Sequence, residues 1–206
     1  MNILLIGASG MIGSRVLAEA KSRGHTVVAA ARRAERIPEG GQSIALDATD
    51  ADAVAKAAAS ADVIVSSVSP RGGGDQTAEA LGVGEALIAA AKKTGKRLFV
   101  VGGAGSLNLP DGSPLAETLP EAYRGEALAM REVLRKLKAS DVNWTFFSPA
   151  GMISPGERTG NYRLGTTTLI LDANGQSKIS AEDYAKALVD ELESPAYERS
   201  QMTIGY

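Results

Sequence analysis

Short runs of apolar residues alternate along this chain with longer stretches that have the alanine- and leucine-rich pattern of helices. Runs such as 3–6, 63–65 and 98–101 are apolar throughout and are bounded by polar residues or glycine. Continuous apolar runs of this length are typical of strands buried on both faces of a parallel sheet, and the stretches between them suit crossover helices. The pattern therefore predicts an α/β protein with a doubly wound, mainly parallel sheet in one domain over residues 1–206.

The individual elements follow from the same pattern and from the residues at helix ends. Strands are predicted at 2–6, 26–31, 43–46, 63–67, 97–101 and 143–147, with a final edge strand at 201–204. Helices are predicted at 11–22, 51–59, 78–93, 122–139 and from position 180 through 192. Capping signals support these bounds: Gly24 and Gly95 follow basic helix endings, Asp50 and Thr77 can cap helix N-termini, and Ser180 with Asp183 resembles a capping box.

Two long segments do not fit the alternation. Residues 102–121 contain three prolines, and residues 151–168 are rich in glycine. Long loops in a compact domain are usually functional, and both segments follow predicted strand C-termini, where ligands bind in open α/β sheets. We expect them to be the substrate-side loops; the alternative is that they are ordinary surface excursions.

Composition excludes several function classes. Lys and Arg number 22 against 24 Asp and Glu, so the net charge of −2 supplies none of the basic excess that nucleic-acid binding uses. With no cysteine and His25 as the single histidine, thiolate and histidine metal sites are not expected, and a Ser-His-Asp triad would need that one residue. No secretion signal and no apolar run of the roughly 18 residues needed to span a membrane is visible, so a soluble cytoplasmic protein is expected.

The first strand-to-helix turn carries the strongest candidate site. It reads Gly7-Ala8-Ser9-Gly10-Met11-Ile12-Gly13. Glycine suits a tight turn at Gly7, close approach of a pyrophosphate at Gly10, and close helix–strand packing at Gly13. Backbone N–H groups around Ser9, Met11 and Ile12 would then face the phosphates at the helix N-terminus. The spacing differs from G-x-G-x-x-G, but the context predicts a Rossmann-type dinucleotide cleft; the alternative is a glycine-rich turn without a ligand.

The end of the second strand indicates which dinucleotide binds. A protein specific for NAD usually has an acidic residue there, whereas this chain has Arg32 and Arg33. A guanidinium can bind a 2′-phosphate bidentately and stack on adenine. NADP(H) is therefore favoured over NAD(H), unless both arginines are ordinary surface charges.

Other candidate cofactor residues follow the remaining strands. Asp47 could accept a bond from the adenine amino group, although capping the following helix region explains it equally well. Small residues are expected where backbone passes close to the ribose and the nicotinamide. They are Ser66, Ser67 and Val68 after the fourth strand, Gly102 and Gly103 after the fifth, and Pro149 and Ala150 after the sixth.

The chain resembles the atypical short-chain dehydrogenase relatives called NAD(P)H-binding or NmrA-like proteins, and among them the NADH-flavin reductase group. The resemblance covers nearly the whole chain and is carried by Gly7–Gly13, Phe99–Leu107, Trp144–Ala150, Pro155–Gly160 and Ile179–Ala185. It implies a single Rossmann domain with NAD(P)H as hydride donor. It also implies a flavin, a quinone or another conjugated small molecule as hydride acceptor.

One departure from that family bears on catalysis. Short-chain dehydrogenases that reduce carbonyls use a Tyr-x-x-x-Lys pair, in which the lysine lowers the tyrosine pKa. Here Tyr123 is followed at the fourth position by Ala127, and the serine expected after the fifth strand is replaced by glycine, with Ser106 displaced along the loop. Tyr123 and Ser106 are therefore weak catalytic candidates, and a strong electrophile such as flavin or quinone fits better than a ketone.

Two alternatives remain open beside a reductase of this kind. Some NmrA-like relatives are non-catalytic redox sensors that bind NADP and report its state to a partner protein. A specialised biosynthetic reductase, isomerase or dehydratase is the other alternative. The sequence does not indicate the acceptor, the pathway or the oligomeric state.

Overall fold

The computed structural model describes residues 1–38, 41–70 and 75–206. The strands are β1 (Asn2–Ile6), β2 (Thr26–Ala31), β3 (Gln42–Ala45), β4 (Val63–Ser66), β5 (Arg97–Val101), β6 (Trp144–Ser148), β7 (Met152–Ser154), β8 (Arg163–Gly165), β9 (Lys178–Ser180) and β10 (Ser200–Gly205). The helices are α1 (Met11–Ser22), α2 (Ala51–Ala57), α3 (Gln76–Thr94), α4 (Leu115–Thr118), α5 (Glu121–Ala139) and α6 (Ala181–Glu193), with short 3₁₀ turns η1 (Ala34–Arg36) and η2 (Ala104–Ser106).

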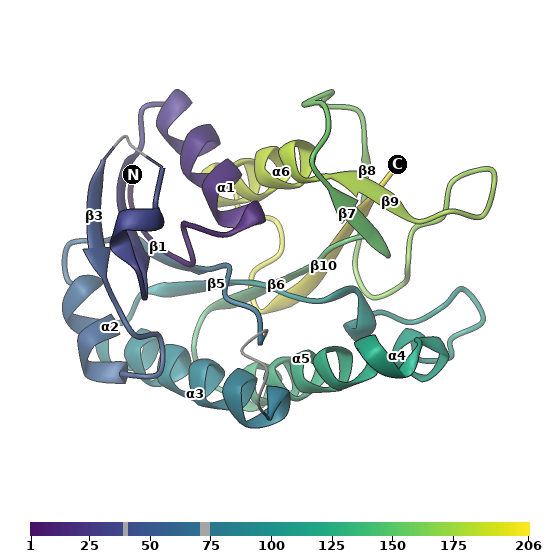
Figure 1. Cartoon of the computed structure of the whole chain (residues 1–206), viewed down its shortest axis with the longest axis horizontal. Coiled ribbons are helices and arrows are strands. Elements are labelled where there is room, and N and C mark those ends of the chain that lie inside the picture. The colour runs from purple at the N-terminus through teal and green to yellow at the C-terminus, as the bar shows by residue number, and fades with distance from the viewer. Residues whose placement is uncertain (39–40, 71–74) are drawn as a thin grey trace.

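One eight-stranded sheet runs through the molecule in the order β3-β2-β1-β4-β5-β6-β10-β8 (Figure 1). Neighbouring strands are parallel from β3 to β10, and β8 is antiparallel to β10. The order reverses between β1 and β4, which is the switch point at which doubly wound sheets bind dinucleotides. The predicted Rossmann-type α/β fold is confirmed.

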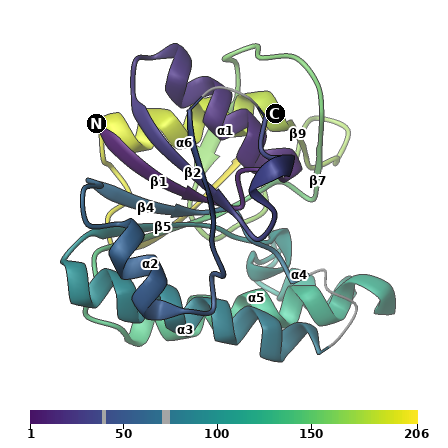
Figure 2. The same cartoon turned by 60° about the vertical axis from the view of Figure 1, so that its left-hand side comes forward.

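Helices cover both faces of this sheet (Figures 1 and 2). Helices α1 and α6 lie together on one face, and α2, α3 and α5 lie on the other. Along β1, Ile3 and Leu5 belong to the core under α1 and α6, while Leu4 and Ile6 belong to the core on the opposite face. Side chains alternate across a strand, so burial of both faces explains why the strand is apolar at every position.

Most predicted element bounds agree with the structure to within a few residues, but the C-terminal strand differs in its place. Residues 200–205 form β10 as a strand, yet it is not at the edge of the sheet. Leu164 of β8 pairs with Ile204, so β8 forms that edge. Three residues carry too short a pattern to predict a strand, so the sequence predicts a loop where β8 lies.

Helix caps confirm part of the prediction and correct the rest. Asp50 caps α2 through the amides of residues 52 and 53. Asp75, and not Thr77, caps α3, since its Oδ1 accepts from the amides of Thr77 and Ala78. Ser180 Oγ accepts from the Asp183 amide as a capping box requires, but the Ser180 amide donates to the Tyr206 hydroxyl instead of to Asp183. Only half of the box is therefore formed.

The two long segments contain regular elements and lie side by side. Residues 102–121 include η2 and α4, and residues 151–168 include β7 and β8. They meet at Asn108, whose amide donates to the Thr167 carbonyl at 2.9 Å and whose carbonyl accepts from the Leu169 amide at 2.8 Å. Leu107, Leu115 and Leu169 form a small core between them. Both segments follow the carboxyl ends of β5 and β6, as predicted from the sequence.

Candidate functional site: the glycine turn and the strand ends around it

The glycine turn is shaped by contact between backbones. Gly7 has a φ of +86°, and a Cβ atom there would lie 2.8 Å from the carbonyl oxygen of Ser67. A Cβ on Gly13 would lie 2.1 Å from the carbonyl oxygen of Gly7. Ser67 Oγ closes the same contact by donating to the Gly7 carbonyl at 3.1 Å. Gly7 therefore makes the tight turn and Gly13 lets α1 pack on it, as the sequence predicts.

Gly10 has a different environment from the other two glycines. It is exposed, and a Cβ atom there would meet only the Gly7 carbonyl oxygen, at 3.3 Å. It caps α1 without any side-chain hydrogen bond, and the first intrahelical bond runs from the Ser14 amide to the Gly10 carbonyl. The amides of Met11 and Ile12 thus lack intrahelical acceptors. Packing restricts this position less than it restricts Gly7 and Gly13, whereas an anion lying against the helix N-terminus would leave no room for a side chain. These residues fit the pyrophosphate of a dinucleotide.

The arginines after β2 are free to bind an anion. Arg32 and Arg33 are both exposed, and within the described residues neither side chain makes a hydrogen bond or ion pair. The Asp47 carboxylate, in contrast, already has hydrogen-bond donors. Its Oδ1 accepts from the amide of Thr49 at 2.9 Å and from the Thr49 hydroxyl at 2.8 Å. These bonds from Thr49, with a smaller contribution from Arg32, lower the Asp47 pKa. This geometry favours the turn-capping role of Asp47, and its contact with adenine stays a prediction.

The turns after β4, β5 and β6 bring the other expected residues to the same edge of the sheet. Ser66 is buried, and Ser67 is held against the glycine turn. Packing alone explains the glycine at position 102, since a Cβ atom on Gly102 would lie 2.2 Å from the ring of Phe146. Gly103, Pro149 and Ala150 follow the ends of β5 and β6, and Val68 follows β4. Their contacts with a cofactor stay predictions.

Ser106 is held in a buried polar cluster. Its side chain is 6% exposed, and Oγ donates to the Gly103 carbonyl at 2.7 Å. Ser148 Oγ lies 2.7 Å away, and Gln201 Nε2 donates to the hydroxyls of both serines at 3.2 and 3.0 Å. Ser106 donates its single hydroxyl proton to the Gly103 carbonyl, and this bond stabilises the η2 turn. It would have to break that bond to act on a substrate.

Tyr123 lies in the first turn of α5 and is 64% exposed. One turn later, Ala127 is buried against η2, where a Cβ atom on Gly105 would lie 2.3 Å from the Ala127 Cβ. The place where a dehydrogenase has its lysine is therefore filled by close helix–turn packing. A lysine could not be accommodated there without moving η2 away from α5.

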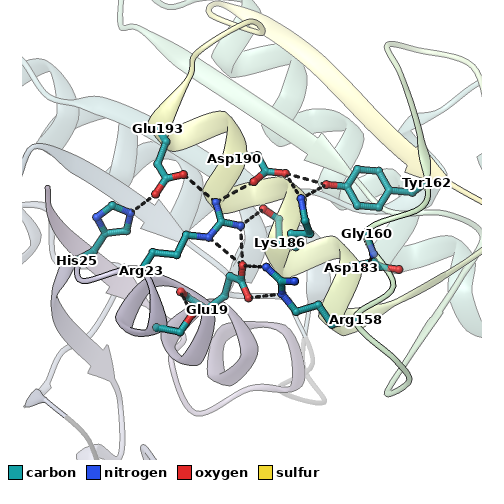
Figure 3. A network of polar contacts seen from close by, with 11 residues as sticks. Glu19, Arg23, His25, Arg158, Gly160, Tyr162, Asp183, Lys186, Asp190 and Glu193 are labelled. Carbon is teal, nitrogen blue, oxygen red and sulfur yellow. Dashed lines mark hydrogen bonds and ion pairs between the residues drawn. The ribbon is translucent and has the colours of Figure 1, made fainter.

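A second polar cluster, which sequence reasoning did not identify, ties the segment after β6 to α1 and α6 (Figure 3). Glu19 on α1 is 8% exposed and accepts bonds from Arg158 at 2.7 and 2.8 Å and from Arg23 at 2.6 and 2.9 Å. The Arg158 guanidinium, and after it Arg23, lower the Glu19 pKa against the effect of burial. Arg23 also reaches Asp190 and Glu193 on α6. The sequence signal that could have revealed this cluster is Glu19, a carboxylate on the otherwise apolar buried face of α1.

Comparison with known proteins places the chain in a family. Residues 7–195 match the model of the NAD(P)H-binding family. The chain belongs to that family. YwnB, an uncharacterized protein of Bacillus subtilis (strain 168), is 38% identical over 212 residues, covering 99% of this chain and 98% of YwnB. A 3-diazoavenalumate denitrifying reductase of a Streptomyces species is 30% identical over 188 residues, covering 82% of this chain and 61% of that protein.

Solved structures of similar proteins have the same architecture. A protein of Burkholderia pseudomallei provisionally named as exported is 43% identical, with a TM-score of 0.88 and 100% of both chains covered. A Bacteroides thetaiotaomicron protein provisionally named as an epimerase is 39% identical, with a TM-score of 0.91 and coverage of 100% of this chain and 96% of that one. SP1627 of Streptococcus pneumoniae, provisionally named as an NADH-flavin reductase, is 30% identical, with a TM-score of 0.88. The match covers 100% of this chain and 99% of that one.

The described residues contain neither a metal-binding cluster nor a membrane-spanning helix. In residues 1–38, 41–70 and 75–206, no three His, Cys, Asp or Glu side chains are grouped so that they could hold a metal ion. Over the same residues, no helix is long and apolar enough to span a bilayer. Since one relative bears the name of an exported protein, the cytoplasmic location expected from the sequence stays a prediction.

Proposed function

We propose that this protein is an NADPH-dependent reductase that transfers hydride to a flavin, a quinone or a related conjugated small molecule. The observation that carries the proposal is the open N-terminus of α1 at Gly10, together with two exposed arginines after β2 whose side chains make no hydrogen bond or ion pair in the described part of the chain. Membership of the NAD(P)H-binding family supports a nicotinamide cofactor. Relatives that bear the names of reductases support hydride transfer.

The chain's own residues would hold the cofactor along the carboxyl edge of the sheet. The Gly7–Gly13 turn would bind the pyrophosphate through backbone amides and the dipole of α1. Arg32 and Arg33 would bind the 2′-phosphate, which distinguishes NADPH from NADH. The turns at 66–68, 102–103 and 149–150 would pass close to the ribose and nicotinamide, which, when bound, supplies the hydride.

The acceptor class is inferred from the two candidate acids among the described residues, neither of which is arranged to donate a proton. Tyr123 has buried Ala127 at the position of the dehydrogenase lysine, and the proton of Ser106 is committed to Gly103. A ketone needs a proton or a strong donor as negative charge develops on its oxygen. A flavin or quinone spreads that charge over a conjugated system and can take its proton from solvent. Orientation of the two rings would then supply most of the catalysis.

One relative favours a second candidate function. The Streptomyces protein is named for the reductive removal of nitrogen from a diazo compound, so a specialised biosynthetic reduction is the chief rival. A non-catalytic NADP sensor differs from both reductases, because it would bind NADPH without oxidising it.

The decisive experiment is steady-state oxidation of NADPH, followed by its absorbance, with FMN, a benzoquinone and a simple ketone as acceptors. We expect turnover with the flavin or quinone and little with the ketone. The Gly10→Val variant controls for contaminating reductases, because it should lose turnover with every acceptor. Tight NADPH binding without oxidation by either conjugated acceptor would contradict the proposal and favour the sensor or the specialised reductase.

A further inference from the structure

Two segments that lie far apart in the sequence meet at the N-terminus of α6. Residues 156–160 pack against the start of α6, where Ser180 Oγ donates to the Glu157 carbonyl at 2.7 Å. Asp183, which is fully buried, accepts from the Gly160 amide at 2.7 Å and the Thr159 hydroxyl at 2.6 Å. The segment 156–160 is therefore held by side chains of α6, and we call it the clasp.

Glu182 connects the clasp to the helix that begins at the glycine turn. Its Oε2 accepts from the Gly156 amide at 2.7 Å, and its Oε1 accepts from Arg15 Nε at 2.6 Å. Arg15 in turn donates from Nη1 to the Met11 carbonyl at 2.9 Å. A continuous chain of hydrogen bonds thus joins the first residue of α1 to the clasp.

The Glu182 side chain is suited to holding both donors. It is 25% exposed and its partner Arg15 is 27% exposed, so the pair is shielded from much of the solvent. Burial raises the Glu182 pKa, but the bonds from Arg15 and the Gly156 amide outweigh burial and lower it overall. The carboxylate is therefore charged at neutral pH and uses one oxygen for each neighbour.

The clasp is continuous with the segment expected to flank the nicotinamide. Ala150 follows β6 and is buried in the core under α6. From there the chain runs through β7, which pairs in parallel with β9, and reaches Gly156. The Gly151 amide donates to Ser177 Oγ at 3.0 Å, so this stretch is fastened at both ends.

We propose that Glu182 is a positioning residue that sets the acceptor-side segment after β6 in register with the cofactor-binding end of α1. This inference rests on the proposed reductase function. Glu182 itself would contact neither cofactor nor acceptor. It would act through Arg15 on one side and the Gly156 amide on the other. Small errors in the distance between nicotinamide and acceptor lower the rate of hydride transfer without weakening the binding of the phosphates.

Removal of Glu182 should leave the clasp folded, because its other anchors remain. Asp183 still binds residues 159 and 160, and Glu19 still pairs with Arg158 (Figure 3). A matched control is available on the same helix. Glu193 pairs with Arg23 and His25 but does not contact the clasp, so Glu193→Gln removes a comparable charge elsewhere on α6.

The kinetic test compares Glu182→Ala, Glu182→Gln and Glu193→Gln with the unmodified protein. We expect Glu182→Ala to lower kcat about tenfold with less than a threefold change in the Kd for NADPH. Glu182→Gln should recover part of kcat, because its single amide oxygen can accept from one of the two donors. Glu193→Gln should leave both constants unchanged. An unchanged kcat in folded Glu182→Ala, or a loss of NADPH affinity equal to the loss of kcat, would overturn the assignment.

A second readout does not depend on turnover. Hydrogen exchange of the Gly156 amide is measured with and without NADP⁺ in the unmodified protein and in Glu182→Ala. We expect NADP⁺ to slow this exchange in the unmodified protein and to have no effect in the variant. Equal protection in both proteins, or none in either, would refute the link. If no acceptor is reduced but the exchange result holds, the proposed reductase function fails while the connection through Glu182 stands.

Discussion

The backbones of Gly7 and Gly13 touch: the carbonyl oxygen of Gly7 lies 2.1 Å from where a Cβ on residue 13 would be. No side-chain rotation relieves this contact, because the Cβ position is fixed by the backbone of residue 13 and its neighbour is the backbone oxygen of Gly7. We expect Gly13→Ala to destabilise the fold by about 2–3 kcal/mol, as overpacking of a core contact does. Urea unfolding measures the loss. Gly10→Ala is the comparison variant and should lose clearly less, because a Cβ atom there would lie 3.3 Å from the same carbonyl oxygen.

Gly10 should matter more for the ligand than for the fold. We expect Gly10→Val to abolish dinucleotide binding, because the added side chain would lie at the helix N-terminus where the pyrophosphate approaches. Fluorescence titration with NADPH measures binding, and thermal unfolding of the same sample checks that the variant is folded. Binding at unmodified affinity would place the cofactor elsewhere.

Arg32 should set the preference between the two dinucleotides. A charge-assisted contact contributes about 1.5–3 kcal/mol, so Arg32→Ala should reduce NADPH affinity by roughly 10- to 100-fold. NADH affinity should change little. Arg135→Ala serves as the control, since this exposed arginine on α5 pairs with Glu132. Equal Kd values for NADPH and NADH in the unmodified protein would show that the preference is wrong.

Tyr123 should assist the reaction only modestly. It is exposed at the start of α5, and the next turn of the helix places buried Ala127 against η2. We expect Tyr123→Phe to lower single-turnover reduction of a flavin or quinone by much less than the roughly 10² to 10⁴ lost when a general acid is removed. Efficient ketone reduction that collapses in this variant would restore a dehydrogenase-type acid.

The Glu19–Arg158 pair should make stability depend on pH. Arg158, followed by Arg23, lowers the Glu19 pKa below its ordinary value of 4.5. A carboxyl with a lowered folded-state pKa stabilises the protein above its unfolded pKa, and this stabilisation is lost as pH falls through the folded-state value.

Arg158→Met should therefore destabilise the protein by about 1 kcal/mol at pH 7, a small value because Arg158 is half exposed. Urea midpoints at pH 7, 5, 4 and 3 should show the difference from the unmodified protein shrinking below about pH 4.5, the ordinary pKa of the Glu19 carboxyl. Arg135→Met is the control, with no loss expected. A difference that stayed constant down to pH 3 would show that the effect comes from packing and not from charge.

The sequence by itself determined the order of the longer strands and helices and the glycine turn, but it did not predict α4, β7, β8 or β9. These are local signals: an apolar run recurs within a few residues, and a cap such as Asp50 acts on amides two and three positions away. The sequence also predicted why glycine occurs at Gly7 and at Gly13. The tight turn and the packing of the helix both depend on backbone that is close in sequence. The roles of Gly10, Arg32 and Arg33 rest on the same local context and await measurement.

The tertiary structure alone decided which distant residues meet. Arg15 and Glu182 are 167 positions apart, and Glu19 and Arg158 are 139 apart. No periodic pattern relates residues at such separations, so the buried position of Glu19 and the bridge made by Glu182 could not be predicted. β8 was missed for a related reason, because a three-residue strand exists only through its pairing with β10. Such contacts depend on how helices and strands pack in space, which a single sequence does not record.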